Sequence, residues 1–263
     1  MSTSKKNGTK PAPKPTPKSA TKPAPKPALK TGADLFKESL KKSNEILLKE
    51  INSLRTKTFN EPERKFNVLI RTSNRPQYFD KCLLSILNQN YKNYHVYVCY
   101  DKIESLSYLG KYNNHPKVTY FPVSVDSKEK YRFNLYMNTL LEKVPNDEWV
   151  LFLDDDDKYT HNLIFKTINS KITSDNDLLI WKFMRPDKLI FPPDYKNIKC
   201  GQIDTTCFTF NKKNIKSSRW GDKQCGDFYF FDQLVKNHNF NRVFVDLIVT
   251  RTIFEDKVAS FGN

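Results

Sequence analysis

The sequence predicts an α/β fold in which a mainly parallel, twisted sheet is flanked by helices. Short apolar runs, rich in aromatic and β-branched residues, alternate along most of the chain with stretches of helical period. Strands of that composition are typical of parallel sheets that helices cover on both faces. The length of 263 residues fits one large α/β domain or two small ones.

The first segment of the chain has a different composition. Residues 1–32 contain eight lysines, seven of the fifteen prolines and no acidic residue. They lack the apolar side chains that offset ordering entropy, so we expect a disordered tail with polyproline-II character. The tail contributes +8 to the formal net charge of +15, and residues 33–263 carry the remaining +7. A solvated spacer is the favoured interpretation, and attachment to an anionic partner is the alternative.

Residues 33–58 are expected to form an amphipathic helix that packs on the rest of the chain. The alternatives for this helix are pairing with another chain and contact with a membrane surface. Its apolar side chains recur at helical spacing, at Phe36, Leu40, Leu47, Ile51 and Leu54.

Residues 60–263 are expected to form a single domain, in which strands and helices alternate most regularly in the first half. Strands are expected at 66–70, 94–100, 117–123, 148–153, 177–184, 188–192, 205–210 and 242–250. Helices are expected around 79–87, at 131–144 and near 227–237.

The cysteines and the missing motifs exclude several classes. There is no G-x-S-x-G, Walker A or G-x-G-x-x-G sequence, which argues against a serine hydrolase, a P-loop nucleotidase and a dinucleotide dehydrogenase. Five cysteines without framework spacing indicate a reducing compartment. Cys200, Cys207 and Cys225 together with His238 lack the close pairs of a zinc site, so we expect buried free thiols.

No apolar run approaches the roughly 18 residues that cross a bilayer, and the basic N-terminus lacks the apolar core of a secretory signal. A cytoplasmic location is therefore expected. Frequent Asn, Lys, Ile, Phe and Tyr are typical of an AT-rich genome. A large DNA virus is one such source, and it would place the protein in the host cytoplasm or the virion.

The densest negative charge follows one of the most apolar runs, in "EWVLFLDDDDKYTHN". We call Asp154–Asp157 the acidic run. In an extended backbone, Asp154 and Asp156 would point one way and Asp155 and Asp157 the other. Ligands of open α/β sheets gather at the carboxyl ends of the strands, and paired carboxylates suit a hard ion such as Mg²⁺ or Mn²⁺. We expect the compensating positive charge to arrive with the ligand. The alternatives are a solvated acidic turn and a calcium loop.

Three segments, in order, resemble family 2 glycosyltransferases with the GT-A fold. "VLFLDDDDKYTHNLI" is similar to the family's Asp-X-Asp region, where a strand ends in Leu-Asp-X-Asp-Asp and a short helix follows. "FNVLIRTSNRPQYFDKCLLSILNQNYKNYHVYVCYD" resembles the family's opening, from a first strand and a Thr/Asn/Arg loop to a strand that ends in aspartate. "YRFNLYMN" resembles its mid-domain helix. The likeness covers residues 66–165 well and continues weakly to about 250.

The resemblance implies a role for each matching residue in holding the donor. Thr72, Asn74 and Arg75 would line the nucleotide, and Asp101 would accept a hydrogen bond from the base. Asp204, in "GQIDTTCFTFNKKNI", would contact a sugar. The plainer alternatives are that Arg75 caps a turn and that Asp101 only ends a strand.

The resemblance also implies a metal site and a catalytic base. Asp154 would lie near the ribose or the metal, Asp156 would hold Mn²⁺ or Mg²⁺ beside the diphosphate, and Asp157 is a further candidate ligand. Family members usually supply the base as the Asp of a Glu-Asp pair, which "QCGDFYFFDQLVKN" lacks. Asp232 fits best because "QLV" follows it. Asp227 is the rival, with a role in the first turn of a helix as its structural alternative.

Aromatic side chains near the expected base are candidates for stacking on an acceptor sugar. They are Trp220, Tyr229, Phe230 and Phe231, and burial in the core is the alternative for most of them.

The expected activity is metal-dependent transfer of a hexose from a nucleotide-diphosphate sugar to a hydroxyl group of a protein or glycan, with inversion. The resemblance to the family implies that the donor is a UDP-sugar. A nucleotidyltransferase is the nearest alternative, although the loop "RTSNRP" lacks the glycines usual there. The other alternative is a non-catalytic module that binds a nucleotide or a polyanion and carries a basic tail.

Overall fold

The computed structural model describes residues 32–56, 63–124 and 128–253. The tail expected to be disordered therefore lies outside the described residues, except for Gly32. The two ends of the domain expected at 60–263 lie outside them as well.

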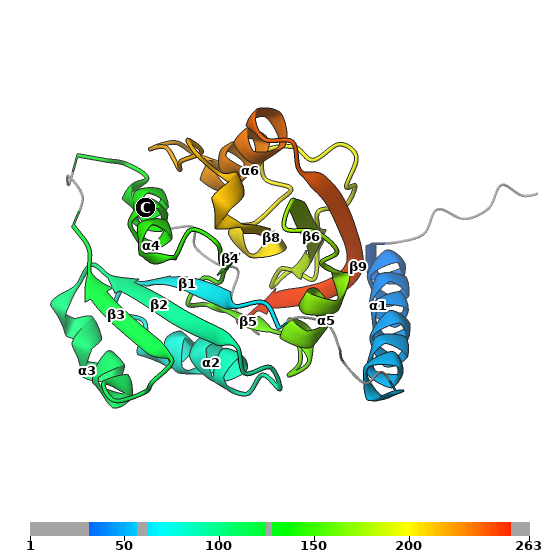
Figure 1. The fold of residues 1–263 in the computed structure, drawn as a ribbon, viewed down its shortest axis with the longest axis horizontal. Helices are drawn as coiled ribbons and strands as arrows, with labels where there is room; N and C mark the ends of the chain where they lie inside the picture. Colours follow the sequence, from blue (N-terminus) through cyan, green and yellow to red (C-terminus); the bar gives the residue numbers. More distant parts are fainter. Residues whose placement is uncertain (1–31, 57–62, 125–127, 254–263) are drawn as a thin grey trace, which may run out of the picture.

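Within the described residues, a curled sheet of nine strands forms the centre of the fold (Figure 1). In chain order the strands are β1 Phe66–Thr72, β2 Tyr94–Tyr100, β3 Val118–Pro122, β4 Trp149–Phe152, β5 Asp157–Tyr159, β6 Asp177–Met184, β7 Ile190–Phe191, β8 Phe208–Asn211 and β9 Asn241–Thr252. Their order in the sheet is β3-β2-β1-β4-β8-β6-β9-β5, with β7 paired to β6. The α/β fold class predicted from the sequence is confirmed.

The strand directions divide the sheet into two parts. From β3 to β4 every pair is parallel. Beyond β4, strand β8 is antiparallel to both of its neighbours, and β6 and β9 are again parallel to each other. Parallel neighbouring strands need a crossover connection, which is usually a helix. The regular alternation of strands and helices in the first half of the chain therefore corresponds to the parallel part of the sheet.

Helices cover both faces of the sheet, and a separate group of buried apolar side chains lies on each face. The α-helices are α1 Gly32–Thr56, α2 Pro76–Leu87, α3 Leu106–Leu109, α4 Arg132–Lys143, α5 Ile164–Lys171 and α6 Gly226–Asn237. Apolar side chains of α2 and α5 pack on one face, whereas those of α4 and α6 pack on the other (Figure 1). Strands β1 and β4 between these layers are almost entirely buried, which explains their continuous apolar sequence.

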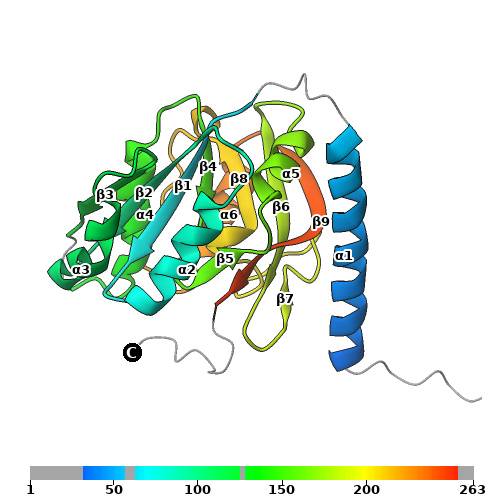
Figure 2. The same cartoon turned by 90° about the horizontal axis from the view of Figure 1, so that it is seen from below.

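The first helix packs along β9 at one side of the sheet (Figure 2). The Ile248 backbone N–H donates to Ser43 Oγ at 3.1 Å, in a buried contact. Ile46 packs against the core, and Lys42 pairs with Asp246 at 2.5 Å. The helix predicted from the apolar stripe at 33–58 is therefore present over 32–56 and covers the flank of its own domain.

Several elements differ from the sequence-based expectation. The strand expected at 205–210 begins with a 3₁₀ turn over Thr205–Cys207, and the strand expected at 188–192 shrinks to β7. Strand β5 and helix α3 were not expected from periodicity, because both are too short to show one. Among the described residues, no helix combines the length and the apolar character needed to cross a membrane.

Cys200 and Cys225 form a disulfide bond. The expectation of free thiols is therefore wrong for these two residues, while Cys82, Cys99 and Cys207 are free and buried. The spacing of 25 residues gave no signal, because the two segments meet only through the fold. The cysteine count consequently gives no support for a reducing compartment.

Candidate active site

The candidate site lies where the carboxyl ends of β1 and β4 meet. The two strands are parallel neighbours, with Leu69 opposite Phe152. Residues that follow them therefore reach the same edge of the sheet. Arg71 and Thr72 end β1, and the acidic run begins two residues after β4.

A turn rather than an extended backbone shapes the acidic run. The Asp157 backbone N–H donates to the Asp154 carbonyl at 2.9 Å, and Asp157 then starts β5, opposite Thr252 of β9. As a result one carboxylate oxygen from each of Asp154, Asp156 and Asp157 lies within 4.8 Å of the others. The expected alternation, with Asp157 on the side of Asp155, is wrong, because pairing with β9 closes the turn.

Asp155 is buried and points away from the other three carboxylates, towards the loop after β1. The Thr72 hydroxyl donates to its Oδ2 at 2.6 Å, and Arg75 Nε donates to the same oxygen at 3.1 Å. Arg75 also contacts Oδ1 and reaches Asp156 Oδ2 at 3.2 Å. Burial raises the pKa of Asp155 to about 7, although the charge of Arg75 acts in the opposite direction. Thr72 and Arg75 thus hold the acidic run in place.

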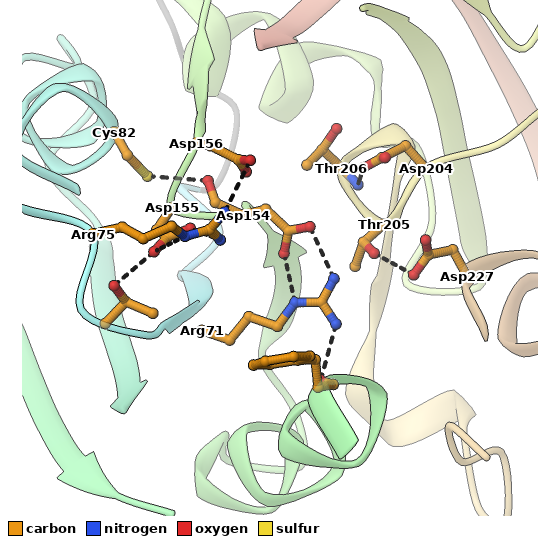
Figure 3. A network of polar contacts seen from close by, with 12 residues as sticks. Arg71, Arg75, Cys82, Asp154, Asp155, Asp156, Asp204, Thr205, Thr206 and Asp227 are labelled. Carbon is orange, nitrogen blue, oxygen red and sulfur yellow. Dashed lines mark hydrogen bonds and ion pairs between the residues drawn. The ribbon is translucent and has the colours of Figure 1, made fainter. Parts of the chain in front are cut away.

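Arg71 forms a two-pronged ion pair with Asp154. Its Nε and Nη2 atoms each lie 2.9 Å from one of the two carboxylate oxygens, and its Nη1 donates to the Phe133 carbonyl of α4 at 2.9 Å (Figure 3). Burial lowers the pKa of Arg71, but the Asp154 carboxylate together with those of Asp227 and Asp204 raises it overall. The expectation that the compensating charge arrives only with a ligand is therefore wrong, because Arg71 and Arg75 already pair with three of the four aspartates.

Two further carboxylates face Arg71 from the second half of the chain (Figure 3). Asp204 accepts the Thr206 backbone N–H at 3.0 Å, and Asp227, in the first turn of α6, accepts from the Thr205 hydroxyl. Burial raises the pKa of Asp204 to about 8, and the neighbouring Asp227 carboxylate adds to this. Burial also raises the pKa of Asp227, whereas the Arg71 charge lowers it.

The carboxylates thus outnumber the arginines, and this excess of negative charge marks a candidate cation site. Burial raises the pKa of Asp156 and, more strongly, that of Asp157, which Asp204 raises further. Oxygens that gather within 4.8 Å suit one hard divalent ion, provided that Arg75 releases Asp156. The residues present therefore fit Mn²⁺ or Mg²⁺.

Asp232 lies away from this group. Five residues after Asp227 on α6, it projects roughly 140° further around the helix. Its carboxylate pairs with Lys236 at 2.7 Å, and its side chain is 30% exposed. The structure thus brings Asp227 to the site and keeps Asp232 on the outer face of the helix.

The remaining donor candidates differ in placement. Asp101 directly follows β2, accepts from the Tyr136 hydroxyl at 3.2 Å, and has a second, buried oxygen without a partner in the described part of the chain. Asn74 is exposed, with a positive φ of 51°, and its backbone N–H donates to Ser105 Oγ at 3.0 Å. The Asn74 backbone therefore shapes the loop between β1 and α2.

Most of the aromatic residues considered for stacking belong to the core. Trp220, Phe230 and Phe231 are buried, and the first two stack with ring centroids 3.5 Å apart. Tyr229 is 40% exposed.

Sequence reasoning missed Arg71. A signal for it existed, since Arg71 sits at the carboxyl end of a predicted strand, as the acidic run does.

The comparisons with known proteins bear directly on this site. The family model described as "Glycosyl transferase family 2" matches residues 67–235, a stretch that includes all of β1 but its first residue, the acidic run, Asp204 and Asp227. The chain belongs to glycosyl transferase family 2. None of the curated protein sequences matches it.

Several solved structures share the fold of this chain. S. aureus TarS superposes with a TM-score of 0.58 at 18% identity, over 72% of this chain and 37% of TarS. Residues 1–349 of TarS in complex with UDP-GlcNAc give 0.57 at 17% identity, over 72% of this chain and 58% of that one. The mannosyltransferase PcManGT from Pyrobaculum calidifontis, in complex with GDP-Man and Mn²⁺, gives 0.55 at 12% identity, over 83% and 67%. The chain thus spans little more than a third of the length of TarS.

Proposed function

We propose that this family 2 glycosyltransferase transfers a hexose from a nucleotide-diphosphate sugar to a hydroxyl acceptor, with a divalent metal and with inversion. The observation that carries the proposal is the convergence of Asp154, Asp156 and Asp157 at the carboxyl edge of the sheet, with Asp227 across from Arg71. The three carboxylates of the acidic run would hold the metal that binds the diphosphate, and Asp227 would take the proton from the acceptor hydroxyl.

The donor is proposed to be a UDP-sugar. In support, TarS has been crystallised with UDP and UDP-GlcNAc. Asp101 offers a buried acceptor oxygen for a base, and Thr72, Asn74 and Arg75 form the loop beside the acidic run. PcManGT carries GDP-Man, so the base is a point on which the two similar structures differ.

Asp154, Asp156 and Asp157 are proposed to hold Mn²⁺ or Mg²⁺. A bound divalent ion stabilises the negative charge that develops on a departing diphosphate. Arg71 keeps Asp154 in place through its paired hydrogen bonds, and Arg75 does the same for Asp155. When Arg75 leaves Asp156 for a phosphate oxygen, it supplies positive charge on the donor side as well.

Asp227 is proposed to accept the proton of the acceptor hydroxyl, and Asp232 is the alternative. A pKa raised by burial brings the Asp227 carboxyl closer to working pH, which favours proton transfer. The Thr205 hydroxyl orients this carboxylate. Asp204, beside it, is proposed to contact a sugar hydroxyl. The acceptor is proposed to be a protein or a glycan in the cytoplasm, and residues 1–32 are proposed to be a spacer.

The experiment compares Asp227→Asn with the matched control Asp232→Asn, in a screen of nucleotide sugars with and without Mn²⁺. We expect Asp227→Asn to bind the donor as the wild type does and to lose transfer by about 100-fold or more. Asp232→Asn should retain at least about a third of the wild-type rate, because its exposed ion pair contributes little. The reverse ranking would assign the base to Asp232. A wild type that consumes no nucleotide sugar would end the proposal.

A further inference from the structure

Tyr136 and Asp101 form a contact that the transfer chemistry itself does not use. Tyr136 is buried on α4, and its hydroxyl donates to Asp101 Oδ2 at 3.2 Å. The other oxygen, Asp101 Oδ1, is shielded from water and has no hydrogen-bond partner among residues 63–124 and 128–253. Buried acceptors are rarely left unpaired, so a ligand N–H is the natural partner for Oδ1.

The Tyr136 hydroxyl limits what Asp101 can recognise, because it leaves one acceptor oxygen rather than two. Guanine presents adjacent N1–H and N2–H donors, which pair best with both oxygens of a carboxylate. Uracil presents a single N–H between two carbonyl oxygens, and a second bare carboxylate oxygen beside those carbonyls would be repelled. A carboxylate with one oxygen capped by a hydroxyl therefore fits the uracil edge better.

An exposed ring stands next to this pair. Phe133 is 42% exposed, and its ring meets that of Tyr136 edge-on, with centroids 5.6 Å apart at an angle of 87°. The Phe133 backbone carbonyl accepts from Arg71, which ties the start of α4 to the acidic run. An exposed aromatic ring offers a face on which a base stacks, but stacking tolerates every base. Discrimination must therefore come from the polar edge at Asp101.

We propose that Tyr136 is a positioning residue that selects uridine over guanosine donors by capping one oxygen of Asp101. This inference rests on the proposed function, which supplies the nucleotide, and adds the group that chooses its base. Replacement of the Tyr136 hydroxyl frees Asp101 Oδ2 for a second donor, and so improves the fit of guanine while it worsens the fit of uracil.

The test is isothermal titration of UDP and of GDP into the full chain with Mn²⁺ present. Wild type should bind UDP more tightly than GDP. In Tyr136→Phe the UDP-over-GDP preference should fall by at least about fivefold, the lower end of what one bidentate base contact contributes. Asp101→Ala removes the edge contact altogether and should bring the two affinities close together.

Tyr91→Phe is the matched control, because it also removes a buried hydroxyl, one that donates to the Arg64 carbonyl at 2.6 Å in the core on the other face of the sheet. The UDP-over-GDP preference of Tyr91→Phe should equal that of wild type. An unchanged UDP-over-GDP preference in Tyr136→Phe would overturn this inference and leave the proposed function standing. If Tyr136→Phe does not fold, an unchanged UDP-over-GDP preference in Asp101→Ala would overturn the inference in the same way. A wild type that binds neither nucleotide would overturn the donor assignment together with it.

Discussion

Arg71 is the residue whose removal should disturb the site most. It bonds both oxygens of Asp154 at 2.9 Å, and only 16% of its side chain and 18% of that of Asp154 are exposed. Loss of one partner from a buried pair costs about 3–5 kcal/mol, because the other charge is left unpaired. Partial exposure places Arg71→Gln at or below the lower end of that range, so we expect a loss of about 2–3 kcal/mol in the free energy of unfolding.

Urea unfolding of Arg71→Gln, Asp154→Asn and the double variant measures this loss and assigns it to the pair. The double variant should be more stable than Arg71→Gln alone, with a coupling energy of about 2 kcal/mol. Asp232→Asn, which breaks an exposed pair with Lys236, should stay within about 0.5 kcal/mol of wild type. A coupling energy near zero would show that Arg71 does not hold Asp154.

Three further outcomes are expected. Burial lowers the pKa of His161 to about 4, so as the pH falls below the ordinary value of 6.5 the unfolded chain binds the proton before the folded chain does, and folding loses stability. The variant His161→Asn keeps an acceptor for the Leu163 backbone N–H but cannot bind that proton. In urea titrations it should therefore lack about 1–2 kcal/mol of the destabilisation that wild type shows between pH 6.5 and 4. A Cβ at Gly226 would lie 2.4 Å from Asn134 Nδ2, so Gly226→Ala should lower stability by about 1–3 kcal/mol, and Asn134→Ala should relieve part of that loss, as calorimetry would show. Reduction of the Cys200–Cys225 bond should cost about 2–4 kcal/mol, measured by urea unfolding with and without a thiol reductant.

Much of the sheet was predictable because burial on both faces leaves a continuous apolar sequence. Strands β2 and β6 have the bounds that their apolar runs predicted. Helix α4 is one residue shorter than expected at each end, and α6 begins one residue earlier than expected. The direction of β8 was not predictable, because four consecutive buried residues have the same sequence pattern in a parallel and in an antiparallel strand pair.

The position of the site was predictable, but its geometry was not. The place of the acidic run after an apolar strand indicated the carboxyl edge of the sheet. The side chain directions depend on a turn that pairing between Asp157 and Thr252 closes, and that contact spans 95 residues of sequence. The choice between Asp227 and Asp232 likewise depends on where α6 begins, because each added residue turns a side chain by about 100°.

The cation site is tested most directly by titration of UDP with and without Mn²⁺, in wild type and in Asp156→Asn. If the carboxylates at the end of β4 hold the ion that carries the diphosphate, Mn²⁺ should tighten UDP binding by about tenfold or more in wild type, and Asp156→Asn should lose that gain. Equal UDP affinity in wild type with and without Mn²⁺, or a full gain in Asp156→Asn, would show that these carboxylates do not bind a diphosphate-carrying metal.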